Sequence, residues 1–123
     1  MDKATVKEME INGITYVPKC AIQQMAEPVD GLKPVIIRTY SAGVHYGYLK
    51  SRDGKEVVLV NSRRIWRWEG ANTCSELALH GLDHTGSKVS EPVPHITLTE
   101  AIEIIECTEE SRESLEGAKW ETE

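Results

Sequence analysis

Arginine and tryptophan alternate in a short stretch near the middle of the chain, VNSRRIWRWEG, residues 60–70. The planar guanidinium of arginine matches the oxygens of a phosphate, and an aromatic ring offers a flat face on which a nucleobase can stack. A second stretch, RTYSAGVHYGY at residues 38–48, adds one more arginine and three tyrosines. Together the two stretches indicate a site for a small, anionic, nucleotide-like ligand.

Residues 63–69 are predicted to form a β-strand, in which successive side chains point to opposite faces. One face then carries Arg64, Trp66 and Trp68, and the other carries Arg63, Ile65 and Arg67. An alternative stays open at this point, because the tryptophans could equally belong to the core while the arginines simply face solvent.

The segment Tyr40-Ser41-Ala42-Gly43 lies between two predicted strands and consists mostly of small residues. Such a turn can bring backbone N–H groups close to an anion, although an ordinary tight turn has the same composition. The segment lacks the glycine patterns of the P-loop and of the Rossmann turn, so neither familiar phosphate-binding loop is present.

Neither a metal centre nor a catalytic group is indicated. His80 and His84 are four residues apart, but Gly81 interrupts the helix that would align them as ligands. The three cysteines, at positions 20, 74 and 107, form no CxxC pair. We therefore predict no metal, no cofactor and no enzymatic activity.

The chain has 123 residues, enough for one domain, and a formal net charge of −6. Residues 38–67 hold seven basic and two acidic side chains, 7 − 2 = +5, whereas residues 99–123 hold two basic and nine acidic ones, 2 − 9 = −7. The acidic total argues against long DNA or RNA, whose binding relies on many phosphate contacts. No apolar run approaches a membrane span and the N-terminus does not resemble a secretory signal, so we expect a cytoplasmic protein without a membrane partner.

The local patterns predict an α+β fold with a mainly antiparallel sheet and short helices in a single small domain. Asn12-Gly13 indicates a hairpin, followed by a short helix after Pro18, within residues 8–26. Residues 35–69, rich in β-branched and aromatic side chains, indicate an antiparallel meander.

The second half of the chain, residues 73–117, is predicted to mix helices and strands. A short helix capped by Thr73 or Ser75 ends at Gly81, and a loop of turn-forming residues follows at 83–94. Residues 96–98 and 102–107 read as short strands, and Thr108 caps a last helix that Gly117 closes. The residues after Gly117 are expected to form a frayed tail.

The run VIIRTYSAGVHYGYLKSRDGKEVVLVNSRRIWRWEGA, with the later LTEAIEIIECTEESRESL, resembles the phage-encoded Thoeris anti-defence proteins of the first described type. The likeness covers residues 35–115 and is weakest at 83–94. It implies a sponge that binds glycocyclic ADP-ribose, the cyclic signal that TIR-domain enzymes make from NAD, without cleaving it. Its matching stretches are residues 38–44 and 63–71, and the candidate ligand contacts are Arg38, Tyr40, Ser41, Ala42, Gly43, Val44, Tyr46, Arg63, Arg64, Trp66, Arg67 and Trp68.

The same resemblance implies an assembly and a setting. Proteins of that family form homo-oligomers built from dimers, up to a hexamer, with signal pockets at subunit interfaces. Some also hold cyclic di- or trinucleotide signals of CBASS defence at separate sites. The expected setting is the host bacterial cytoplasm during phage infection, and the N-terminal hairpin is expected to contribute to the assembly surface.

Two other functions stay open. A small module that binds single-stranded nucleic acid would use the same alternation of arginine and tryptophan. A hydrolase that degrades the cyclic signal would need a base, for which the candidates are His45, His80 and His84.

Overall fold

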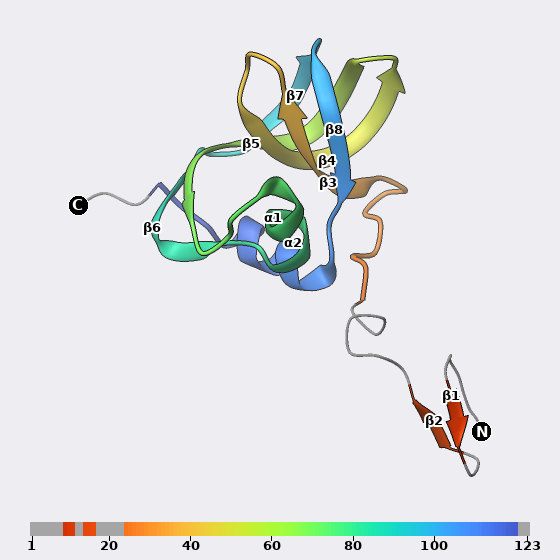
Figure 1. Cartoon of the computed structure of the whole chain (residues 1–123). Coiled ribbons are helices and arrows are strands. Elements are labelled where there is room, and N and C mark those ends of the chain that lie inside the picture. The colour runs from red at the N-terminus through yellow and green to blue at the C-terminus, as the bar shows by residue number, and fades with distance from the viewer. Residues whose placement is uncertain (1–8, 12–13, 17–23, 121–123) are drawn as a thin grey trace.

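The computed structural model describes residues 9–11, 14–16 and 24–120 (Figure 1). Within them lie eight strands and two helices: β1 Met9–Ile11, β2 Ile14–Tyr16, β3 Lys33–Thr39, β4 Val44–Asp53, β5 Glu56–Glu69, α1 Cys74–His80, β6 Asp83–Val89, β7 Val93–Leu98, β8 Ala101–Glu106 and α2 Glu109–Glu116. The predicted α+β class, with a mainly antiparallel sheet in a single small domain, is confirmed.

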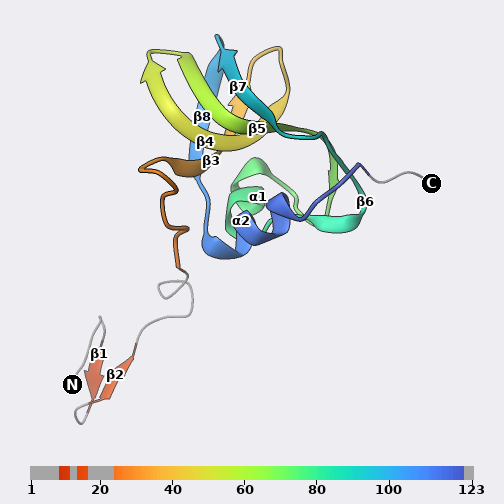
Figure 2. The same ribbon diagram turned by 180° about the vertical axis from the view of Figure 1, so that it is seen from behind.

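Six of the strands form one antiparallel sheet, in the order β6-β5-β4-β3-β8, with β7 also paired to β5. The predicted meander over residues 35–69 is its centre, because β3 pairs with β4 and β4 with β5. Strand β5 is long enough for its first half to pair with β7 and its second half with β6. Figures 1 and 2 show this sheet strongly curled, with both helices on one side of it.

The sheet buries apolar side chains on both faces. In β3, Ile36 joins the core that packs under helices α1 and α2, where Leu77 and Leu115 are fully buried. Its neighbours Val35 and Ile37 join a second core inside the curl of the sheet. This alternation is the period-two pattern that a β-strand imposes on its side chains.

Each helix is held by the cap that the sequence predicted. Thr73 accepts a hydrogen bond from the backbone N–H of Glu76, and the φ of 82° at Gly81 ends α1. Thr108 accepts one from the backbone N–H of Ser111 at the start of α2. Neither helix in the described part of the chain is long and apolar enough to cross a bilayer.

The N-terminal hairpin is present, since β1 pairs with β2 in antiparallel register. Its turn residues, Asn12 and Gly13, lie outside the described residues, as does most of the short helix predicted after Pro18. Residues 24–26, which are described, are not helical.

The prediction of a loop at residues 83–94 is wrong. Residues 83–89 form strand β6, and strand β7 begins at Val93. The turn-forming composition misled the prediction because β6 is an edge strand of which only Ser87 and Val89 are buried. Its backbone bonds to β5 hold it in place without an apolar pattern of its own. The tail predicted after Gly117 is also partly ordered, because Trp120 forms a bridge with Lys88 of β6.

The face assigned to Trp68 is wrong as well. The pairing of β5 with β6 shifts register between Ile65 and Arg67, which marks an extra residue in β5. Beyond this bulge the alternation is reversed, so that Trp68 packs on the same core as Ile65. Trp66 stays outside, with 59% of its surface exposed.

Candidate functional site

A cleft of about 490 Å³ opens beside the first residues of helix α1, and we call it the α1 cleft. It brings together three predicted ligand-binding residues from the two sequence stretches, Arg38, Val44 and Trp68. Its other lining residues are Asn72, Thr73, Cys74, Ser75 and Glu103. Ligand pockets in proteins commonly measure ~300–1,000 Å³, so the cleft has room for a nucleotide.

The sheet places these three residues side by side. Arg38 of β3 lies directly opposite Val44 of β4 in the antiparallel ladder, so both side chains point toward the helices. The bulge in β5 turns Trp68 to the same side. Its indole Nε1 donates to the carbonyl oxygen of Ala71 over 3.1 Å, which fixes the ring against the cleft.

The opposite wall of the α1 cleft is polar. The backbone N–H of Glu76 donates to Oγ1 of Thr73 over 3.2 Å, which leaves the hydroxyl hydrogen of Thr73 available to a ligand. Within the described residues, the hydroxyl of Ser75 has no side-chain hydrogen bond. Arg38 lies 3.7 Å from the carboxylate of Glu103, and both side chains are about half exposed, so this pair is loose.

These groups match the parts of a nucleotide. A guanidinium binds phosphate, a carboxylate binds ribose hydroxyls, and an indole contacts a base. Burial raises the pKa of the Cys74 thiol and the Glu103 carboxylate raises it further, against the opposing effect of Arg38, so less of the reactive thiolate is present than for a free cysteine. The groups that line the cleft are therefore of the kinds that could bind a nucleotide.

The turn Tyr40-Ser41-Ala42-Gly43 forms a separate exposed feature at the tip of the β3–β4 hairpin. Tyr40 is 79% exposed. Two of the turn's amides are already used, since Tyr40 N–H donates to the carbonyl of Glu100 and Ala42 N–H to Oγ1 of Thr39. The predicted cradle of backbone N–H groups is thus only partly available. The hydroxyl of Ser41 donates to the Glu100 carboxylate.

Arg64 lies against this turn. A Cβ atom at Gly43, which has a φ of 86°, would be only 3.0 Å from Nη2 of Arg64, so the glycine leaves room for the guanidinium. Among the described residues, the Arg64 guanidinium has no hydrogen bond or ion pair. Arg64 pairs with His45 in the ladder, so it lies on the other face of the sheet from Arg38.

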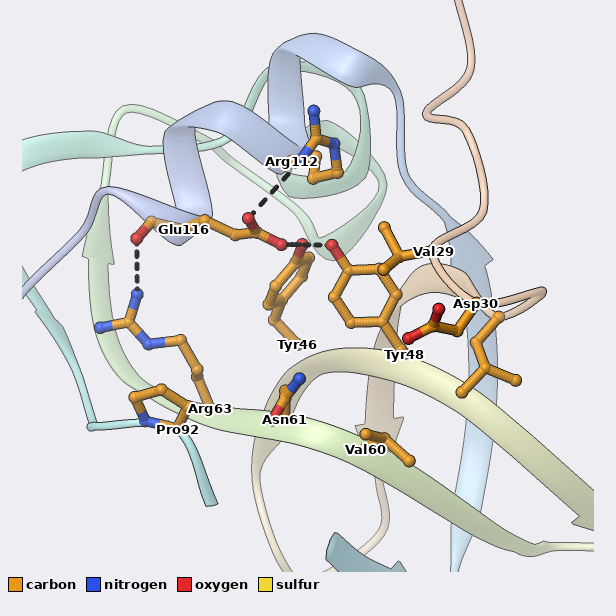
Figure 3. A pocket seen from close by; sticks show the side chains of 11 residues that line it. Val29, Asp30, Tyr46, Tyr48, Val60, Asn61, Arg63, Pro92, Arg112 and Glu116 are labelled. Atoms are coloured by element: carbon orange, nitrogen blue, oxygen red, sulfur yellow. Dashed lines mark hydrogen bonds and ion pairs between the residues drawn. The ribbon is translucent and has the colours of Figure 1, made fainter. Parts of the chain in front are cut away.

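Arg63 and Tyr46 line a second cavity, of about 440 Å³, between residues 29–32, strands β4 and β5 and helix α2 (Figure 3). We call it the strap cavity. The guanidinium of Arg63 is buried and donates to four backbone carbonyls, those of Ser90, Leu115, Glu116 and Ala118. These bonds already occupy the Arg63 guanidinium within the fold.

The floor of the strap cavity is a carboxylate shared by two phenols. Tyr46 donates to Oε2 of Glu116 over 2.7 Å, and Tyr48 donates to the same oxygen (Figure 3). Burial raises the pKa of both tyrosines, and the hydrogen bond to Glu116 raises it further. Arg112 approaches the other oxygen of Glu116 at 3.5 Å.

The remaining two predicted residues face solvent. The Trp66 ring stacks against that of Trp120, with centroids 5.5 Å apart and Lys88 above both rings. Arg67 forms an exposed ion pair with Glu69 at 3.2 Å. The twelve predicted residues therefore spread over the α1 cleft, the hairpin tip, the strap cavity and this outer surface.

Sequence reasoning missed several polar residues that line the two cavities. Ser75 entered only as a possible helix cap and Glu103 only as part of a strand, and Asn72 was not singled out. The backbone N–H and the side-chain amide of Asn72 both donate to the Glu76 carboxylate. Asn61, which lines the strap cavity, carried a usable signal: asparagine is depleted in strands, yet it stands inside β5 between Val60 and Ser62.

Within the described residues, no group of three or more His, Cys, Asp or Glu side chains could hold a metal ion. No curated protein and no solved structure matches the chain. A family profile described as a domain of unknown function, DUF6948, matches residues 32–115, which include the whole lining of the α1 cleft and most of that of the strap cavity. The chain belongs to this family.

Proposed function

We propose that this protein binds and sequesters glycocyclic ADP-ribose, a TIR-derived cyclic ADP-ribose signal, without cleaving it. By holding the signal in the host cytoplasm during phage infection, it blocks activation of the bacterial Thoeris effector. The resemblance of residues 35–115 to the Thoeris anti-defence sponges supports the identity of the ligand.

The observation that carries the proposal is the composition of the α1 cleft. Arg38 and Trp68 come from two separate stretches of sequence, and both line one cavity of about 490 Å³ beside free hydroxyl groups. A guanidinium, an indole and hydroxyls in one cavity are what a phosphate, a base and a ribose require together. Sequestration needs affinity and no turnover, so it makes no demand for a catalytic group.

A filtration experiment tests this function. The purified protein is incubated with the products of an activated TIR enzyme and removed by filtration, and the filtrate is assayed for signal before and after the retained protein is heated. We expect the signal to leave the filtrate and to return intact on heating. Signal that stays in the filtrate overturns the proposal, and signal that never returns identifies a hydrolase instead.

Two matched arginine variants test the site. Arg38→Gln removes the guanidinium from the α1 cleft, and Arg67→Gln removes a similarly exposed guanidinium, also paired to a glutamate, from outside it. We expect Arg38→Gln to weaken signal binding roughly 10-fold or more, as for a charge-assisted phosphate contact worth about 1.5–3 kcal/mol. Arg67→Gln should bind like the unmodified protein. Equal affinities for the two variants would exclude the α1 cleft as the site.

A further inference from the structure

The strap cavity contains hydrogen-bond acceptors that the described structure leaves unused. Asp30 and Asn61 both line it, and within the described residues neither side chain has a hydrogen bond or an ion pair. Figure 3 shows the Asp30 carboxylate directed toward the ring of Tyr48, and Asn61 rising from β5 on the neighbouring side of the same space. An occupant of this cavity would therefore meet a free carboxylate and a free amide.

The backbone holds these two side chains in an uncommon conformation. Asp30 and Asn61 have φ values of 55° and 52°, and they are the only non-glycine residues with positive φ among those described. Asp30 precedes Gly31 in a two-residue turn closed by hydrogen bonds between Val29 and Leu32, and Asn61 lies where the β4–β5 register shifts. Aspartate and asparagine tolerate such φ values better than other non-glycine residues, and Asp-Gly is a preferred pair in a two-residue turn, so both residue types suit the backbone. Their side chains remain without a hydrogen bond or ion pair among the described residues.

The pairing of the charges in the strap cavity, rather than their sum, favours a cation. Arg112 is already bound by the carboxylates of Glu109 and Glu116, and Arg63 is surrounded by carbonyl oxygens. Among the residues that line the cavity, the two carboxylates of Asp30 and Glu116 balance these two guanidiniums, 2 − 2 = 0. The unpaired member of this set is Asp30.

Part of the lining is apolar. Val29 and Leu32, from residues 29–32, and Val60 of β5 line the cavity together with Tyr48. A cation that is bound here would keep its charged end at Asp30 and Asn61 while its hydrocarbon part contacts these side chains and the ring. Aromatic rings also attract cations through their faces.

We propose that the strap cavity is a binding site for a small organic cation, a guanidinium or a primary amine on a short apolar chain. The charged group donates hydrogen bonds to the Asp30 carboxylate and to the amide oxygen of Asn61. The strap cavity is separate from the α1 cleft, and its proposed ligand has the opposite charge. The cation proposal therefore does not depend on the nucleotide proposal.

An NMR titration of the full-length, isotope-labelled protein tests the site with two probes of the same shape. n-Butylguanidinium carries the charge, and n-butylurea replaces it with a neutral group. We expect n-butylguanidinium to shift the amide signals of residues 29–32 and 60–61 in a saturable way, and n-butylurea to bind at least tenfold more weakly. Equal binding of the two probes, or no shift with either, overturns the proposal.

Substitutions that are compatible with the positive φ values at these positions test binding without disturbing the fold. Asp30→Asn keeps a residue that suits a turn with positive φ, and Asn61→Gly suits a φ of 52°, so both proteins should fold. We expect Asp30→Asn to reduce n-butylguanidinium affinity to the level of n-butylurea, and Asn61→Gly to weaken it severalfold. The control is Asp53→Asn in the other Asp-Gly turn, before Gly54 at φ 62° and outside the cavity, which should change nothing. An unchanged affinity in Asp30→Asn, or an equal loss in Asp53→Asn, would reject the cation site.

Discussion

His45 is a titratable side chain buried behind the hairpin tip, with only 3% of its surface exposed. Its Nε2 lies 3.0 Å from the carbonyl oxygen of Ala42 and donates to it, while Nδ1 is buried and has no hydrogen-bond partner among the described residues. Burial lowers the pKa of His45 below its usual 6.5, as does the nearby charge of Arg64, against the opposing bond to Ala42. Folding therefore makes this imidazole harder to protonate.

The neutral His45 predicts a loss of stability in mild acid. The unfolded chain takes up the proton more readily, so the free energy of unfolding should fall as the pH drops below about 6.5, by at most about 1.4 kcal/mol per pH unit. Urea unfolding at pH 7.5 and pH 5.5 measures this change. His45→Gln should reduce the difference, whereas His95→Gln, at an exposed position on β7, should leave it unchanged. A pH dependence that survives in His45→Gln would assign it to other groups.

Arg63 predicts a second effect at a single residue. Replacing it by methionine should lower the free energy of unfolding by about 3–5 kcal/mol, because four backbone carbonyls lose their donor in a buried place. Arg67→Met, at an exposed arginine of the same strand, should change stability by less than about 0.5 kcal/mol. Chemical denaturation of both variants provides the comparison. Similar small losses in both would show that Arg63 contributes little to the fold.

The α1–α2 pair makes a prediction at the scale of elements. Gly81 ends α1 at a φ of 82°, and a Cβ atom there would be 2.3 Å from Cβ and Oγ of Ser114 in α2. We expect Gly81→Ala to lower the free energy of unfolding by about 2–4 kcal/mol, through backbone strain and this overlap. Gly54→Ala, at a φ of 62° with open space around it, should cost only the strain, about 1–2 kcal/mol. If thermal melts show an equal loss of stability in the two variants, then α1 and α2 can move apart at Gly81 and Ser114 at little cost.

How well the sequence predicted an element depended on where its stabilising contacts come from. The helices α1 and α2 carry their caps within their own sequence, and β3 carries its β-branched pattern, so all three were predicted. Strand β6 was missed because its place in the fold depends on backbone bonds to β5, which composition does not reveal. The bulge that turns Trp68 inward depends on the same pairing, so a strict alternation placed this residue on the wrong face.

At the scale of the whole molecule, ion pairs within the fold bring some of the basic residues of the sequence next to some of the acidic ones. Lys33 and Arg38 of β3 lie beside Glu106 and Glu103 of β8, which joins the basic middle of the chain to its acidic end. The sequence contained both charge blocks but could not reveal that they meet across one ladder. The α1 cleft arises in the same way, from β3, β4, β5, β8 and α1 together, which is why only part of its lining was predicted.

The hydrogen bonds of Arg63 to helix α2 can form only late in the synthesis of the chain. A nascent chain leaves the ribosome N-terminus first, and the carbonyl of Leu115 lies 52 residues after Arg63. Strand β5 is therefore complete long before its arginine can reach helix α2, and during that interval the positive charge stays in water. Charged side chains within a strand oppose its pairing with other chains, and Arg63 is one of three arginines in β5. We therefore expect Arg63, together with Arg64 and Arg67, to oppose aggregation of the unfinished chain before it forms its bonds to α2.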